Sequence, residues 1–153
     1  MKIVICAQGG GLKKSYNKAA QDEYSRRLQH YCEVSVIDAS SHQLAGYARF
    51  EECVRVLLDA RGEELSSHDF AERLQGLMNM GTRKLLFFIG GAEGFSPVLQ
   101  PFIEQNKSNR PLSPGVSILS FGKLTLPHEL ARVILLEQLY RAFSILKGEP
   151  YDK

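Results

Sequence analysis

Two segments in which an apolar run leads into glycine are the places in this sequence where a ligand could approach the main chain. The first, FFIGGAEGF (87–95), contains Gly90, Gly91 and Gly94, and the second is SFGKLT (120–125). Glycine loses more backbone entropy on folding than any other residue, so a cluster of glycines is expected where side chains would obstruct a close approach. Both segments are therefore candidate binding loops.

The spacing of these glycines restricts the ligand. Ligands of α/β proteins bind outside the carboxyl ends of the strands. The first segment reads G-G-x-x-G, which is not the G-x-G-x-x-G of a dinucleotide site, and no Gly-Lys-Ser/Thr follows to make a P-loop. Two such segments could form the walls of one slot in which main-chain N–H and C=O groups contact a planar base. We predict a nucleotide-like ligand, and the alternative is a tight turn that binds nothing.

Charged residues in the last apolar segment are a second source of possible chemistry. The pattern predicts a helix from Thr125 to Leu146, apolar on more than one face, that carries Arg132, Glu137 and Arg141. Such a helix is either enclosed in the core or shared with another subunit, and we favour the second, which implies a homodimer. Buried charges are costly unless they are paired, so for Arg132 and Glu137 salt bridges between subunits compete with catalysis as a role.

The elements that position these residues follow from short apolar runs alternating with helical patterns. Nearly continuous runs of Val, Ile, Leu and Phe are typical of strands covered on both faces. Five such runs are Ile3–Ala7, Val34–Ala39, Val54–Asp59, Leu85–Gly90 and Val116–Phe121. Further helices are expected at Tyr16–Tyr31, Ser66–Met78 and Pro97–Asn106. This alternation predicts an α/β fold with a mainly parallel sheet and flanking helices, and the length suggests one domain, residues 1–153.

Composition argues against several other classes of protein. Cys6, Cys32 and Cys53 are odd in number and form no C-x-x-C pair, so we expect reduced thiols. No His/Cys/Asp cluster has ligand spacing, and we expect no metal. No apolar run approaches the roughly 18 residues of a membrane span, and the first run is too short for a signal peptide, so we expect a cytoplasmic protein. A net charge of +2 neither demands nor excludes a nucleic-acid partner.

Long motifs in the second half of the chain resemble one family. IGGAEG is followed by LSFGKLTLPHELARVILLEQLYRAFSILKGEPY, in which TLPHxLxRVxLxEQLYRAxxI and GxPY are specific matches. The sequence resembles the ribosomal RNA large subunit methyltransferase H family, which belongs to the SPOUT superfamily of knotted S-adenosylmethionine-dependent methyltransferases. LLDARGEELSSHDFAERL and YSRRLQHY also fit, so the resemblance covers nearly the whole chain and is strongest from Leu85 onward.

The resemblance implies a fold, a cofactor and a reaction. Members of this superfamily thread the chain through a loop, which implies a C-terminal trefoil knot in the α/β domain. The cofactor would be S-adenosylmethionine, and the reaction would be methylation of N3 of a pseudouridine in helix 69 of 23S ribosomal RNA in the 70S ribosome. The positions that match the family's cofactor contacts are Leu58, Gly90, Phe121, Gly122, Lys123, Leu124, Thr125 and Leu126.

The same resemblance suggests catalytic residues. The acceptor nitrogen carries a weakly acidic proton, so a base or an oxygen-stabilising cation should help. We expect Arg141 to contact the substrate and Tyr151 to lie over the cofactor or stack on a base, while His128 is either catalytic or a helix-start histidine without a chemical role. The family usually ends Pro-Tyr-His and a basic residue, whereas this chain ends PYDK, and Asp152 cannot switch its charge near neutral pH as histidine does.

The altered tail leaves two alternatives open. One is a SPOUT methyltransferase that acts on tRNA, and the other is a non-catalytic ribosome-binding or assembly factor. Contact with RNA would need cations, and the best cluster is Lys13, Lys14 and Lys18 with Arg26 and Arg27, although such charges can also form a merely solvated helix face. With so modest a net charge we expect weak binding to free RNA and recognition of a folded ribosomal surface.

Overall fold

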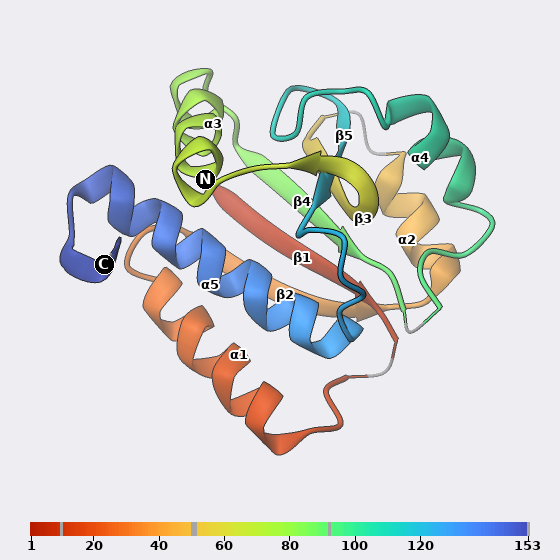
Figure 1. Ribbon diagram of the computed structural model, residues 1–153, viewed down its shortest axis with the longest axis horizontal. Coiled ribbons are helices and arrows are strands. Elements are labelled where there is room, and N and C mark those ends of the chain that lie inside the picture. Colours follow the sequence, from red (N-terminus) through yellow and green to blue (C-terminus); the bar gives the residue numbers. More distant parts are fainter. Residues whose placement is uncertain (10, 50–51, 92, 153) are drawn as a thin grey trace.

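A single parallel sheet organises the computed structural model, which describes residues 1–9, 11–49, 52–91 and 93–152 and leaves out the side chain of Asp152. Within these residues the strand order is β2-β1-β4-β3-β5, and every neighbouring pair is parallel (Figure 1). The strands are β1 (Lys2–Gln8), β2 (Glu33–Ala39), β3 (Val54–Glu64), β4 (Lys84–Ile89) and β5 (Val116–Ser120). Their carboxyl ends therefore meet at one edge of the sheet.

Helices cover both faces of the sheet (Figure 1). One face carries α1 (Ser15–Leu28), α3 (Ser67–Asn79) and the long α5 (His128–Lys147), with α5 lying between the other two. The opposite face carries α2 (Ser41–Ala48) and α4 (Gln100–Asn106). A short 3-10 turn, η1 (Pro150–Asp152), folds the tail back against α5.

The strands are apolar on both sides because each side has its own core. Successive side chains of a strand point to opposite faces. In β4, Leu85, Phe87 and Ile89 pack in the core under α3 and α5, whereas Leu86 and Phe88 pack in the core under α2 and α4. The α/β fold with a mainly parallel sheet is thus confirmed, and the continuous apolar runs have the cause that the sequence suggested.

Several predicted boundaries need correction. The strand expected at Val54–Asp59 continues to Glu64, and the helix expected from Thr125 begins at His128 because Pro127 occupies the N-cap position. The short helix α2 was not predicted, although Ser40 and Gln43 form a capping box at its start. The helix expected at Pro97–Asn106 is confirmed from Gln100 to Asn106.

The end of β3 wraps closely around β5. Leu119 pairs with Leu58 and, after an irregularity in the register, also with Glu63, so residues 59–62 pass around one residue of the neighbouring strand. A Cβ atom placed on Gly62 would lie 2.7 Å from the carbonyl carbon of Ile118, which leaves no room for a side chain. This close passage is consistent with the predicted knot, whose threading stays a prediction.

The structure also bears on disulfide bonds, metal sites and membrane-spanning helices. Cys6, Cys32 and Cys53 are free thiols, and burial raises the pKa of Cys6 to about 12 and that of Cys32 to about 11, so thiolates are scarce at neutral pH. Within the ranges given above, no group of three or more His, Cys, Asp or Glu side chains is arranged to hold a metal ion. No helix in those ranges has the length and apolarity needed to cross a membrane.

Substitution of Gly62 tests the close crossing. Gly62→Ala should lower the free energy of unfolding by about 2–3 kcal/mol, because the added methyl group overlaps the backbone of β5 and the strands must separate. Gly76→Ala in α3 is the matched control: its Cβ meets no atom within 4 Å, so helix propensity should raise stability by about 0.5–1 kcal/mol. Urea unfolding curves measure both changes. Equal effects of the two substitutions would contradict the crossing.

Candidate active site

A cleft of about 220 Å³ lies at the carboxyl ends of β3, β4 and β5. Its walls are the end of β3, the glycine loop after β4, the segment after β5 and the first turn of α5. Seven of the eight predicted cofactor residues line it: Leu58, Gly90, Phe121, Gly122, Leu124, Thr125 and Leu126. The eighth, Lys123, is exposed beside them and does not line the cleft, whereas His128 does. The two glycine-containing loops therefore form one slot, as the sequence predicted.

The glycine loop after β4 is a tight turn in which Gly90 has no space for a side chain. Gly91 and Gly94 exchange main-chain hydrogen bonds of 3.1 and 3.0 Å, and Gly94 has a φ of +80°. A Cβ atom on Gly90 would lie 2.7 Å from the carbonyl carbon of Gly94. The sequence predicted that a ligand lies close to the main chain here. At Gly90, the group that lies close is partly the protein's own backbone.

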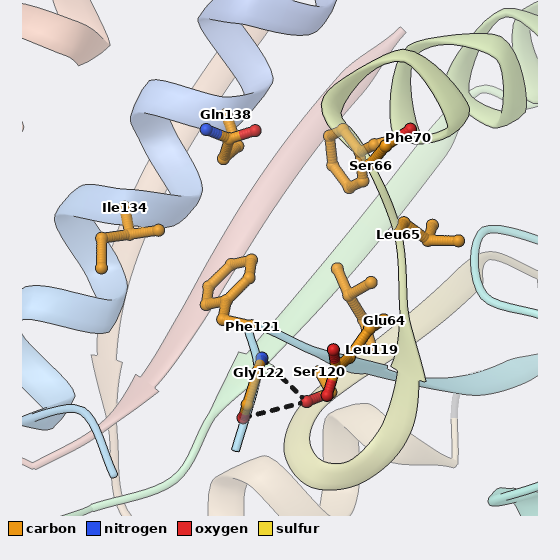
Figure 2. Close-up of a pocket in the computed structure, with 10 residues that line it drawn as sticks. All are labelled: Glu64, Leu65, Ser66, Phe70, Leu119, Ser120, Phe121, Gly122, Ile134 and Gln138. Atoms are coloured by element: carbon orange, nitrogen blue, oxygen red, sulfur yellow. Dashed lines mark hydrogen bonds between the residues drawn. The ribbon is translucent and has the colours of Figure 1, made fainter. Parts of the chain in front are cut away.

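The opposite wall presents open main chain. Gly122 has a φ of +109°, a conformation that other residues rarely adopt, and a Cβ there would meet no atom within 4 Å. The hydroxyl of Ser120 accepts a hydrogen bond from the N–H of Gly122 at 3.1 Å and donates one to its carbonyl at 3.3 Å (Figure 2). Leu124 follows and is 83% exposed at the rim. This wall leaves space beside the backbone where a ligand can lie.

A second cavity, of about 260 Å³, lies toward α3 and α5 and shares Leu119, Phe121 and Gly122 with the cleft. Figure 2 shows the ring of Phe121 directed into this cavity, with Ile134 of α5 on one side and Phe70 of α3 on the other. Phe121 therefore stands between the two cavities. A change in its rotamer would alter both.

The first turn of α5 is tied to the beginning of the chain. Glu129 is buried and accepts hydrogen bonds from the main-chain N–H groups of Lys13 (3.1 Å) and Lys14 (3.3 Å) and from the side-chain amide of Asn17 (3.0 Å). These bonds, led by that from Asn17, hold the pKa of Glu129 below its ordinary value, so the side chain is an anion at neutral pH. Sequence reasoning did not single out Glu129, since its partners lie more than 110 positions away.

Arg132, one turn further along α5, is only 2% exposed and has partners in its own chain. Its Nη2 donates to Oδ1 of Asp38 at 2.7 Å and its Nη1 to Oε1 of Gln21 at 3.4 Å. This pair joins α5 to the end of β2 and to α1. Arg132 thus fixes the position of the helix start that borders the cleft.

The other end of α5 carries a separate cluster around the tail. Nη2 and Nε of Arg141 donate to Oε1 of Glu137 at 2.7 and 3.0 Å, and the guanidinium lies 5.0 Å from the ring centre of Tyr151. The Tyr151 hydroxyl donates to the same carboxylate oxygen at 3.2 Å and lies 3.2 Å from the hydroxyl of Tyr24. Burial, together with these neighbours, raises the pKa of Tyr151 well above its ordinary value. Tyr151 is therefore a hydrogen-bond donor at neutral pH rather than a base.

The structure does not bring all the predicted catalytic residues together within one chain. Arg141 follows His128 by 13 residues on the same helix, which is about 20 Å along its axis. Arg141 and Tyr151 are close to each other, while His128 belongs to the cleft. The side chain of Asp152 lies outside what the structure describes, so its role stays a prediction.

The fold and the cleft together indicate the class of protein. The sheet is parallel, and its last strand leads past a glycine-lined cleft into a long C-terminal helix. A family model described as "Predicted SPOUT methyltransferase" matches residues 1–152, and the chain belongs to this family and, within it, to the ribosomal RNA large subunit methyltransferase H proteins. A solved structure described as "Structure of the putative methyltransferase Lpg2936 from Legionella pneumophila in complex with the bound cofactor SAM" shares the fold. Its TM-score is 0.50 at 14% sequence identity, and the match covers 93% of this chain and 66% of that one.

Curated relatives named "Ribosomal RNA large subunit methyltransferase H" match over the full length. The protein of Halothermothrix orenii is 36% identical over 172 residues, covering 100% of both chains, and that of Coprothermobacter proteolyticus is 35% identical over 153 residues with the same coverage. The protein of Clostridium botulinum (strain Kyoto / Type A2) is 34% identical over 163 residues, covering 94% of this chain and 95% of its own. The resemblance named from the sequence is confirmed.

The cleft fits S-adenosylmethionine, the cofactor expected for this family. The open space beside Gly122 can admit a flat adenine ring, and Leu58, Phe121 and Leu126 offer apolar contact to its faces. When bound, the cofactor supplies an electrophilic methyl group on a sulfonium. The task of the surrounding residues is to hold that methyl group toward the acceptor.

Gly90 tests this assignment of the cleft. Gly90→Ala should raise the dissociation constant for S-adenosylmethionine about tenfold or more. The loop must open to make room for the alanine side chain, and one wall of the cleft then shifts. Isothermal titration calorimetry measures the effect. Gly46→Ala in α2, where a Cβ meets no atom within 4 Å, is the control and should bind as wild type does. Unchanged affinity in Gly90→Ala would show that the cofactor binds elsewhere.

Proposed function

We propose that this protein transfers a methyl group from S-adenosylmethionine to 23S ribosomal RNA, at N3 of a pseudouridine in helix 69 of the assembled ribosome in the cytoplasm. The observation that carries the proposal is the cleft, in which seven residues matching the family's cofactor contacts converge on one slot. Full-length similarity to relatives named ribosomal RNA large subunit methyltransferase H supports the choice of RNA.

Positioning is the main catalytic task for these residues. Displacement at a sulfonium needs an in-line approach and no acid for the leaving group, and good alignment can supply on the order of 7–11 kcal/mol. N3 of a pseudouridine lies between two carbonyl groups, so loss of its proton spreads negative charge onto their oxygens. The Arg141 guanidinium is suited to donate a hydrogen bond to such an oxygen, as is the protonated Tyr151 once its hydroxyl turns away from Glu137, and His128 is the candidate proton acceptor in the cleft.

We infer a homodimer, because these groups lie at opposite ends of α5. The outward face of α5 combines apolar side chains such as Leu130, which is 38% exposed, and Ile134 with the Glu137–Arg141 ion pair. If two copies of α5 paired in opposite directions, the tail of one chain would lie beside the cleft of its partner. Each site would then take His128 from one chain and Arg141 with Tyr151 from the other.

A labelling experiment tests the proposed substrate. The purified protein with tritiated S-adenosylmethionine should label the 23S RNA of 70S ribosomes taken from a strain lacking the gene, and should leave tRNA unlabelled. Nuclease digestion followed by mass spectrometry should then place the methyl group on a pseudouridine of helix 69. The Gly90→Ala variant serves as the reduced-activity control at subsaturating cofactor.

The alternatives predict other results. Label in tRNA but not in ribosomes would move the target while keeping the enzyme class. If calorimetry detected no binding of S-adenosylmethionine, a non-catalytic ribosome-binding factor would be the better account.

Complementation between subunits tests the composite site. Gly90→Val should inactivate the cleft, and Arg141→Ala combined with Tyr151→Phe should inactivate the tail, so each variant alone should be nearly inactive. Co-expressed in equal amounts, the two should recover about a quarter of wild-type activity, because half of the dimers are mixed and each mixed dimer has one intact site. Methyl transfer to 70S ribosomes measures the recovery. An inactive mixture containing verified mixed dimers would mean that each chain completes its own site.

A further inference from the structure

A short segment before and inside the first turn of α1 combines three lysines with an exposed aromatic ring. Its sequence, KKSYNK, contributes Lys13, Lys14, Tyr16 and Lys18, which we call the Lys13–Lys18 surface. All four side chains are exposed, and Tyr16 is 68% exposed, a high value for so large a ring. An accessible ring among cations matches the chemistry of unpaired RNA, whose phosphates attract lysine and whose bases stack on aromatic side chains.

Ion pairing distinguishes this surface from the neighbouring arginines, which share one carboxylate between them. Arg26 and Arg27 both form ion pairs with Glu23, at 2.9 and 2.6 Å. Among the residues that the structure describes, Lys13, Lys14 and Lys18 form no ion pair. Of the basic cluster expected from the sequence, the three lysines are therefore the members without a carboxylate partner among the described residues.

The surface is held rigidly at the cofactor end of α5. Glu129 accepts hydrogen bonds from the main-chain N–H groups of Lys13 and Lys14 and from the side chain of Asn17. These contacts use the backbone of the two lysines and leave their ammonium groups in solvent. Because Asn17 lies between Tyr16 and Lys18, the same carboxylate fixes the whole segment.

The surface also lies next to the cleft. His128, which lines the cleft, precedes Glu129, and a Cβ atom on Gly9 would lie 4.0 Å from Nε2 of His128. Figure 1 shows α1 running alongside α5, with the loop that precedes α1 at the end where α5 begins. The nearby carboxylate of Asp38 is paired with Arg132. Glu129 stays an anion, because its N–H partners are neutral, and its one charge is outnumbered by those of the three lysines.

We propose that the Lys13–Lys18 surface binds the substrate RNA next to its reacting nucleotide, with the lysines on phosphates and the ring of Tyr16 under an unstacked base. This inference rests on the proposed function, since it takes RNA as the substrate. Glu129 is a positioning residue in this arrangement, because it sets the distance between the RNA backbone and the cleft. The surface determines how RNA binds and takes no part in the transfer itself.

Two variants and a matched control test the proposal. The triple variant Lys13→Ala/Lys14→Ala/Lys18→Ala should raise the KM for 70S ribosomes about tenfold or more, with kcat within about twofold of wild type, because phosphate contacts contribute to binding. Tyr16→Ala should raise KM several-fold by loss of stacking. Arg26→Ala/Lys107→Ala removes two cations that are already paired with Glu23 and Glu104, and should behave as wild type. Calorimetry should give every variant the wild-type affinity for S-adenosylmethionine.

A binding assay without catalysis separates this proposal from the proposed function. Fluorescence anisotropy with a stem-loop RNA, titrated from about 50 to about 200 mM salt, should give a log–log salt slope that is shallower by about 2–3 in the triple variant. Tyr16→Ala should weaken binding to the stem-loop and leave binding to a fully paired duplex unchanged. If wild type labels no ribosomes while these binding differences are found, the proposed function fails and the RNA surface stands. If wild type labels ribosomes while the triple variant keeps its KM and salt slope, the surface is refuted and the function stands.

Discussion

The passage of β3 around β5 is the constraint on which the functional part of the molecule depends. Residues 59–62 pass so close to Leu119 that Gly62 lies against the backbone of the neighbouring strand. This contact places the end of β3, the glycine loop after β4 and the segment after β5 around one cleft. The parallel sheet brings these ends to the same edge, and the irregular end of β3 adds Asp59 and Ala60 to the lining of the cleft. The shape of the cleft therefore depends on the close passage of residues 59–62 beside β5 as well as on the lining residues.

The long helix α5 carries two separate groups of polar contacts. At its start, Glu129 and Arg132 attach it to the first half of the chain through buried polar contacts, so the wall of the cleft that contains His128 is rigid. At its other end, Glu137 gathers Arg141 and Tyr151 into a compact group. A rigid helix of this length keeps the two groups at a fixed separation.

Much of the fold could be predicted from the sequence, because strands with a core on each side give nearly continuous apolar runs. The extension of β3 beyond Asp59 could not, since most of the added residues are polar or glycine and only Glu63 and Glu64 pair with β5 again. In the site, the glycine positions and the loop after β5 were predictable from type and spacing. The role of Glu129 was not, because an acidic residue in a first helical turn is common and its partners belong to a distant loop.

Glu129 accepts hydrogen bonds from the main-chain N–H groups of Lys13 and Lys14, and every residue except proline provides such a group. Side chains at these two positions can therefore be exchanged during evolution without loosening the loop or disturbing the cofactor cleft. If the Lys13–Lys18 surface binds RNA as proposed, the residues that select the target are separate from those that line the cleft. Lineages with differently shaped ribosomes could adapt the first by ordinary point mutations while the second stays intact.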